Sequence, residues 1–110
     1  MKDNPLIEKS KAFALNIVKL CSETKPSVMT NQVSRSGTSI GANIHEANYA
    51  HSKSDFIAKL QIALKECYET EYWLEILFKS ETISDKQILA DCRELRRILI
   101  ASCMTAKNNK

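Results

Sequence analysis

The sequence predicts an all-α protein folded as an antiparallel up-down-up-down four-helix bundle, and three observations lead to this class. The 110 residues include only 2 glycines and 2 prolines, far fewer than the tight turns of an all-β domain require. Apolar residues recur every three or four positions along most of the chain, the period of a helix buried on one face. With 44% hydrophobic and 26% charged residues, the composition is typical of one globular core. We therefore expect a single domain over residues 1–110.

The first helix is predicted at about residues 5–24. Asn4 followed by Pro5 is typical of a helix start, because asparagine caps a helix and proline fits its first turn. The Thr24-Lys25-Pro26 segment should end the helix. Its apolar face comprises Leu6, Phe13, Ile17 and Leu20.

A second helix, capped by Ser27, is predicted at about residues 28–50, and its central stretch RSGTSIGANIHEA contains both glycines. No G-x-x-x-x-G-K-[ST] pattern occurs there, so a phosphate-binding loop is not expected. A glycine inside a helix costs about 1 kcal/mol relative to alanine, so Gly37 and Gly41 predict close approach of helices on both sides of this one. The alternative is that both are tolerated weak spots near a kink. The apolar stripe comprises Met29, Val33, Ile40, Ile44 and Ala47.

Three polar residues of the second helix, Arg35, Ser39 and Glu46, share its outward arc. They are predicted either to pair with one another or across a subunit contact, or to form a solvated charged face.

The third and fourth helices are predicted at about residues 53–79 and 84–106. Ser52 or Ser54 with Asp55 opens the third, and Ser84 with Asp85 opens the fourth. The third helix has the clearest heptad pattern: Phe56, Leu60, Ala63, Cys67, Thr70, Leu74 and Leu77. The core positions of the fourth are Ile88, Cys92, Leu95, Leu99 and Ser102.

These two helices carry more apolar residues than the core of a single bundle needs, including a second stripe on the third helix and residues flanking the core on the fourth. Large apolar side chains on a second face are either scattered exposed residues or are covered by another subunit. We therefore predict self-association. The predicted interface residues are Ile62, Trp73, Ile76, Leu89, Ile98 and Ile100.

The net charge of +3 is only mildly basic, and the clearest basic cluster lies on the fourth helix. Its members are Lys86, Arg93, Arg96 and Arg97. They predict phosphate-dominated RNA or DNA binding if the charge is repeated in an oligomer; the alternative is a solvated face. Because no aromatic residue interleaves with these positions, stacking on unpaired bases is not expected.

The chain lacks the residue patterns of a metal or catalytic site. His45 next to Glu46 suggests H-E-x-x-H, but position 49 is Tyr49 rather than histidine. We expect no metal, no cofactor and no catalytic residue. Glu71 lies near the core seam and should find a hydrogen-bond partner or shift its pKa. Because no C-x-x-C pair occurs, the four cysteines are expected as reduced thiols: Cys21, Cys67, Cys92 and Cys103. The absence of a signal peptide or a long apolar run predicts a cytoplasmic protein without a membrane partner.

Two stretches of the chain, RSGTSIGANIHEA and SDFIAKLQIALKECYETEYWLEIL, carry a family resemblance. They strongly resemble the family of four-helix bundles named for the protein encoded in the intervening sequence of bacterial 23S ribosomal RNA genes. The resemblance covers nearly the whole chain, although the family commonly has an apolar or small residue at His45. It implies a homopentameric barrel without known enzymatic activity. A related member, the accessory variability determinant of diversity-generating retroelements, is a pentamer whose basic surface binds nucleic acid and a reverse transcriptase. The motif maps onto Arg35, Ser36, Gly37, Ser39, Ile40, Gly41, Asn43, Ile44, Glu46, Glu69, Glu71, Tyr72 and Trp73.

Taken with the residue patterns, this predicts a non-enzymatic, self-associating scaffold that binds RNA or DNA. A second hypothesis is a protein–protein adaptor that displays surfaces to a polymerase such as a reverse transcriptase and binds no nucleic acid. The third, least favoured, is a small-molecule or metal-binding bundle with enzymatic activity.

Overall fold

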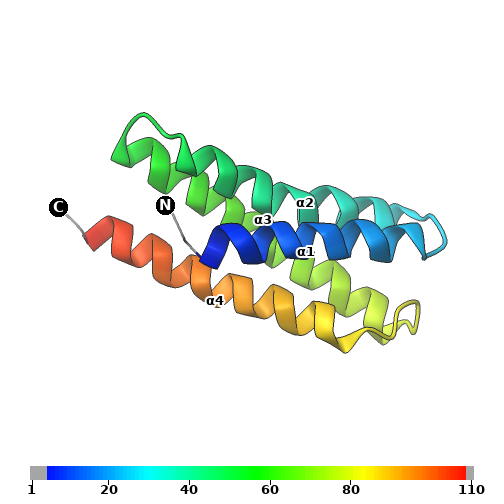
Figure 1. Ribbon diagram of the computed structural model, residues 1–110. Helices are drawn as coiled ribbons and strands as arrows, with labels where there is room; N and C mark the ends of the chain where they lie inside the picture. The colour runs from blue at the N-terminus through cyan, green and yellow to red at the C-terminus, as the bar shows by residue number, and fades with distance from the viewer. Residues whose placement is uncertain (1–4, 109–110) are drawn as a thin grey trace.

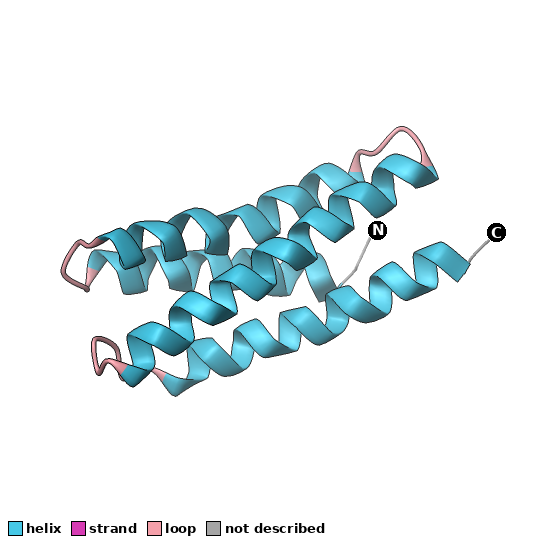
Figure 2. Cartoon of the chain, turned by 180° about the vertical axis from the view of Figure 1, so that it is seen from behind, coloured by secondary structure: helices cyan, strands magenta, loops and turns pink. Residues whose placement is uncertain are grey.

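The computed structural model describes residues 5–108 and contains four α-helices and no strand within that range (Figure 1 and Figure 2). The helices are α1 (Pro5–Ser22), α2 (Val28–Asn48), α3 (Lys53–Lys79) and α4 (Lys86–Asn108). The all-α class predicted from the sequence is confirmed.

The helices form an elongated molecule of 46 × 23 × 19 Å, with the three connections at alternating ends (Figure 1). α2 and α4 each pack against both α1 and α3, whereas no Cα atom of α1 lies within 8 Å of one of α3 over the described residues. α1 and α3 therefore occupy opposite corners, and each turns an arc of side chains outward.

Side-chain caps determine where three of the helices begin. The Ser27 hydroxyl accepts a hydrogen bond from Thr30 N at 3.1 Å, and Thr30 Oγ1 accepts one from Ser27 N at 2.8 Å. This reciprocal pair satisfies N–H groups that lack a partner within the helix. Of the two serines proposed to open α3, it is Ser52 that accepts from Asp55 N, at 3.0 Å. Asn4, the predicted cap of α1, lies outside the described residues.

The ends of α1, α2 and α4 differ from the predicted ones by two residues. α4 begins at Lys86 rather than at residue 84, because Asp85 acts as its cap and accepts from Gln87 N at 2.9 Å. α1 ends at Ser22, since Thr24 turns its hydroxyl back to the Leu20 carbonyl at 2.6 Å. α2 ends at Asn48 because Tyr49 leaves the helical conformation, with φ −112° and ψ 19°.

One continuous core runs between the four helices and contains most of the predicted apolar positions. Four predicted positions are only half-buried instead: Leu20, Met29, Phe56 and Ser102. On α4 the buried residue is Cys103, although Ser102 and Cys103 lie about equally far from the centre of the core face.

The small residues of α2 bring it close to both neighbours. A Cβ added to Gly37 would lie 2.9 Å from Ile17 Cγ1 of α1, and one added to Gly41 would lie 3.4 Å from the Ser10 carbonyl oxygen. On the other side, Ser36 Oγ lies 2.8 Å from Thr70 Oγ1 of α3, and both residues are fully buried. The predicted close approach on both sides is confirmed, with glycines facing α1 and a serine facing α3.

Candidate nucleic-acid interface

The basic residues of α4 are linked to α3 through one carboxylate. Arg93 Nε donates to Glu71 Oε2 at 3.0 Å, and Arg96 Nε donates to Glu71 Oε1 at 2.8 Å. A second nitrogen of Arg96, Nη2, lies 3.4 Å from Glu71 Oε2. Arg93 also approaches Glu75 at 3.9 Å. Glu71 thus holds two arginines in place on the outer side of the α3–α4 seam.

Glu71 remains a charged acceptor although its side chain is only 13% exposed. Burial raises the pKa of this carboxyl, but the hydrogen bonds from Arg93 and Arg96 outweigh burial and hold the pKa below its ordinary value. Of the two predicted alternatives for Glu71, the hydrogen-bond partner is confirmed.

The four predicted nucleic-acid-binding residues are therefore not equivalent. Arg93 is partly engaged but 42% exposed, and Arg96 is 26% exposed. Lys86 and Arg97 are exposed and form no ion pair within residues 5–108. Arg97 follows Arg93 by four residues, so the two occupy the same outward arc of α4.

One exposed tyrosine of α3, Tyr68, borders this basic surface. The guanidinium carbon of Arg96 lies 5.8 Å from the centroid of the Tyr68 ring, and Tyr72 follows one turn later. Their exposed fractions are 50% and 58%. No aromatic residue interleaves the basic positions within α4, as expected, but α3 places an aromatic ring beside Arg96. The tyrosines' spacing of four residues on the outward arc of α3 was the available sequence signal.

A second polar cluster joins α2 to α3 and uses several motif residues. Arg35 Nη1 donates to Glu66 Oε2 at 3.0 Å, and Arg35 Nη2 pairs with Glu69. Glu69 also accepts from Trp73 Nε1 at 3.1 Å. The hydrogen bond from Arg35 lowers the pKa of Glu69. This cluster braces two helices and orients the indole of Trp73.

The other polar residues of the outward arc of α2 also have defined partners. Glu46 pairs with Lys59 of α3 at 3.1 Å, and Asn43 Nδ2 donates to the Ser39 carbonyl at 2.9 Å. Pairing of Arg35, Ser39 and Glu46 with one another is therefore wrong. The two charged members reach α3 because the α2–α3 contact is the most extensive in the bundle.

Of the six predicted interface residues, Ile62 is exposed, by 43%, and the other five are half-buried. Trp73, Leu89 and Ile98 pack against the core cluster from outside. On α1, Leu15 and Val18 are exposed by 66% and 55%. These two apolar residues were not predicted as interface positions, because they lie outside the core stripe of α1.

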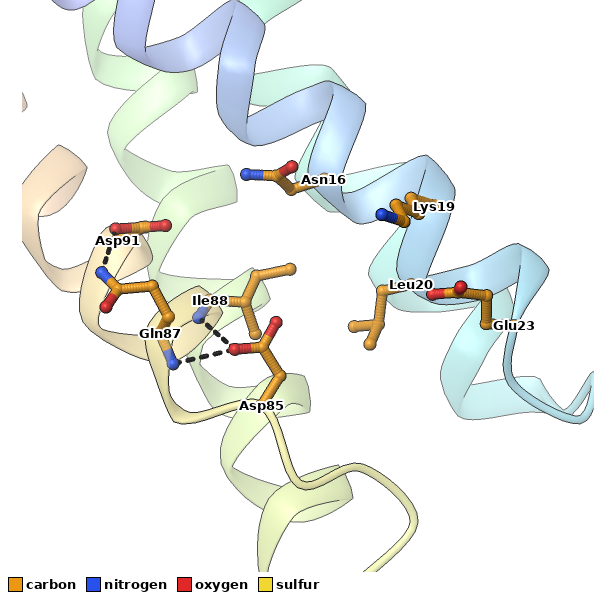
Figure 3. A pocket seen from close by; sticks show the side chains of 8 residues that line it. All are labelled: Asn16, Lys19, Leu20, Glu23, Asp85, Gln87, Ile88 and Asp91. Carbon is orange, nitrogen blue, oxygen red and sulfur yellow. Dashed lines mark hydrogen bonds between the residues drawn. The ribbon is translucent and has the colours of Figure 1, made fainter.

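A polar cavity of about 250 Å³ lies between the end of α1 and the start of α4, and its lining side chains are drawn in Figure 3. Asp85, which lines it, caps α4, and Gln87 Nε2 donates to Asp91 at 2.8 Å. No three His, Cys, Asp or Glu residues lie close enough together to hold a metal ion in the described part of the chain.

The four cysteines are free thiols. Cys67 and Cys92 bring their Sγ atoms to 3.9 Å at the buried α3–α4 seam, and Cys92 Sγ approaches the Cys67 carbonyl at 3.6 Å. The hydrogen bond with Cys67 and burial together raise the pKa of the Cys92 thiol. A thiolate is therefore strongly disfavoured at this position.

Among the described helices, none combines the length and apolar character that crossing a bilayer demands.

Comparison with known proteins finds a similar solved structure and a matching family model. A crystal structure from Bacteroides thetaiotaomicron, described as a protein with unknown function from the S23 ribosomal protein family, is 50% identical to this chain. It superposes with a TM-score of 0.84, and the match covers 89% of this chain and 97% of the other. A search of curated proteins finds no match. The family model for the 23S rRNA-intervening sequence protein matches residues 2–101. Because this match spans nearly the whole chain, the protein belongs to the 23S rRNA-intervening sequence protein family.

Proposed function

We propose that this protein is a non-enzymatic, self-associating helical scaffold that binds RNA or DNA through the basic outer surface of α4. The observation that carries the proposal is the arginine pair Arg93 and Arg96, which Glu71 holds at the outer side of the seam. Arg97 and Lys86 extend this surface as exposed cations. Fixed guanidinium groups lose little side-chain entropy when they bind phosphate, and they bind it in a defined orientation.

The assembly in this proposal is a ring of antiparallel up-down-up-down bundles, which the family resemblance makes a homopentamer. Leu15 and Val18 of α1 and Ile62 of α3 are exposed apolar residues on opposite corners of one bundle. A contact between two different faces of identical subunits is head-to-tail, and such contacts close into a ring when the rotation fits. The other predicted interface residues would border that contact.

Assembly would strengthen the electrostatic part of the proposal. One chain carries a net charge of +3, so five copies carry +15. Repetition of the α4 surface around a ring enlarges the positive field that phosphates meet. The affinity would then fall steeply with salt and depend little on sequence.

Native mass spectrometry of the full chain tests the assembly. We expect a pentamer, and we expect Ile62→Glu to reduce its stability because a charge would be buried in the contact. Gln61→Glu, at the neighbouring exposed position on α3, controls for charge alone. A stable wild-type monomer at micromolar concentration would refute the ring.

Filter binding to mixed-sequence RNA and DNA over a salt series tests the nucleic-acid role. We expect Arg97→Gln to weaken binding and to reduce the slope of log K against log salt by about 1. Lys25→Gln, in the exposed α1–α2 connection, is the matched control. Undetectable binding at low salt would remove nucleic acid as the partner and leave the protein–protein adaptor.

A further inference from the structure

We propose that Tyr68 and Tyr72 form a stacking platform for unpaired bases, so that the protein prefers single-stranded RNA or DNA to duplex. This inference rests on the proposed nucleic-acid function and specifies its ligand. Neither tyrosine belongs to the buried core, and their exposed fractions are 50% and 58%. Four residues apart on a helix, they are about 6 Å apart along its axis.

The two rings differ in their surroundings. Tyr68 lies against the guanidinium of Arg96, whose carbon is 5.8 Å from the ring centroid. Tyr72 meets Trp73 edge-on at 5.2 Å between centroids. Each ring thus has a neighbour that restrains it and still leaves about half of the side chain accessible. Restrained aromatic groups lose little conformational entropy when a ligand stacks on them.

The arginines of α4 supply the phosphate contacts beside this platform. Glu71 accepts from both Arg93 and Arg96 through Nε atoms, so the Nη1 groups of both arginines have no acceptor within the described chain. Arg97, one turn beyond Arg93, has no ion-pair partner there either. A strand that follows the α3–α4 seam would place its bases over α3 and its phosphates along α4.

Tyr68 lies on the opposite flank of α3 from Ile62 and Trp73 of the predicted subunit contact, whereas Tyr72 meets Trp73 edge-on. Tyr68 faces α4 through Arg96, whereas Trp73 reaches toward α2 through Glu69, which pairs with Arg35. Ile62 shares the α2 flank by its helical position. A subunit docked there would leave Tyr68 accessible.

Duplex DNA or RNA cannot use this surface in the same way. Its bases are paired and stacked in the interior, so the exposed tyrosines meet only the backbone. Unpaired bases have free faces that stack on aromatic side chains whatever their sequence. Aromatic groups next to cations therefore favour a single strand, whereas the cations alone would bind both forms.

The test is fluorescence anisotropy of the full chain with three labelled probes of equal length: a mixed single strand, its duplex, and a single strand of abasic residues. We expect the single strand to bind most tightly. Tyr68→Ala should weaken single-strand binding about five- to hundredfold and change duplex and abasic binding by less than about twofold. Tyr68→Phe should retain the affinity, because it keeps the ring. Tyr49→Ala removes another exposed tyrosine, outside the platform, and should have no effect.

The outcomes separate this inference from the proposed function. Equal binding of all three probes, with Tyr68→Ala and Tyr72→Ala unchanged, would overturn the platform and leave a phosphate-binding scaffold. Failure of every probe to bind would overturn the proposed function itself. Native mass spectrometry of each variant is the fold and assembly check. Loss of the oligomer in Tyr68→Ala would assign the tyrosine to a subunit contact and overturn the inference.

Discussion

Glu71 accepts hydrogen bonds from two arginines of α4, and Glu71→Gln tests how strongly this link stabilises the bundle. Glutamine keeps the size of the side chain and one acceptor oxygen, so the change removes charge without creating a cavity. Two charge-assisted hydrogen bonds, at 3.0 and 2.8 Å, are weakened. A hydrogen bond to a charged group contributes about 1.5–3 kcal/mol.

The expected loss is smaller than the sum of two such bonds. The side chains of Arg93 and Arg96 are 42% and 26% exposed. In the variant, water can therefore replace part of the hydrogen bonding that the carboxylate gave to the two guanidinium groups. We expect a loss of about 1.5–2.5 kcal/mol in the free energy of unfolding, or roughly 5–12 °C in melting temperature for a domain of this size. Glu94→Gln is the matched control, because its partner Lys9 and Glu94 itself are 44% and 47% exposed. An exposed pair of that kind contributes less than about 1 kcal/mol.

The assay is urea and thermal unfolding followed by circular dichroism at one fixed protein concentration, since oligomerisation makes stability concentration-dependent. The pH dependence adds a second reading. The pKa of Glu71 is lower in the folded state, so its contribution is fully present above the unfolded value of about 4.3 and is lost as pH falls through the folded pKa. The gap between wild type and Glu71→Gln should therefore narrow at strongly acidic pH. A loss no larger than that of Glu94→Gln, or a gap that stays constant in acid, would refute this account.

Three further changes test other features of the fold. Gly37→Ala should be destabilising by about 1 kcal/mol in urea unfolding, because its Cβ would lie 2.9 Å from a buried isoleucine and overpacking exceeds the gain in helix propensity. Gly41→Ala, whose Cβ would meet Ser10 atoms no nearer than its carbonyl oxygen at 3.4 Å, should be neutral or stabilising, and equal effects of the two would contradict the packing argument. Glu81→Gly should raise stability by about 0.5–1 kcal/mol in the same assay, since Glu81 has φ 63°, a conformation that costs an L-residue more than a glycine; a lower melting temperature would count against this. Cys67 and Cys92 are both fully buried, so they should react with a maleimide only at the rate of unfolding. Rapid labelling of the native protein, detected by mass spectrometry, would show that the thiols are accessible and would contradict this.

The family motif is explained in part by contacts between α2 and α3. Ser36 approaches Thr70 in the core, and Arg35 reaches Glu66 and Glu69. Gly37 allows α1 to approach. These residues hold three helices in register, which gives the motif a structural role.

The class of the fold was predictable because helix formation here is a local property of the sequence. Apolar spacing placed the four helices, and capping serines and proline placed their starts within two residues. Some core positions were predicted wrongly, such as Ser102, where Cys103 is the buried residue. At these places a step of three residues and a step of four are nearly equivalent, and only the neighbouring helix decides which residue is buried.

Only the basic residues of the candidate nucleic-acid surface were predictable from the sequence. The arginines of α4 are visible as a stripe along one helix, but their carboxylate partner and the two tyrosines come from α3, 22 to 28 residues away in sequence. The separation of α1 from α3, with outward apolar residues on each, is likewise a property of how the helices are arranged. By itself the sequence determined which residues are helical and which of their faces are apolar, since both follow from the repeat of a single helix. Which side chains of different helices meet depends on packing angle and register, and only the tertiary structure decided that.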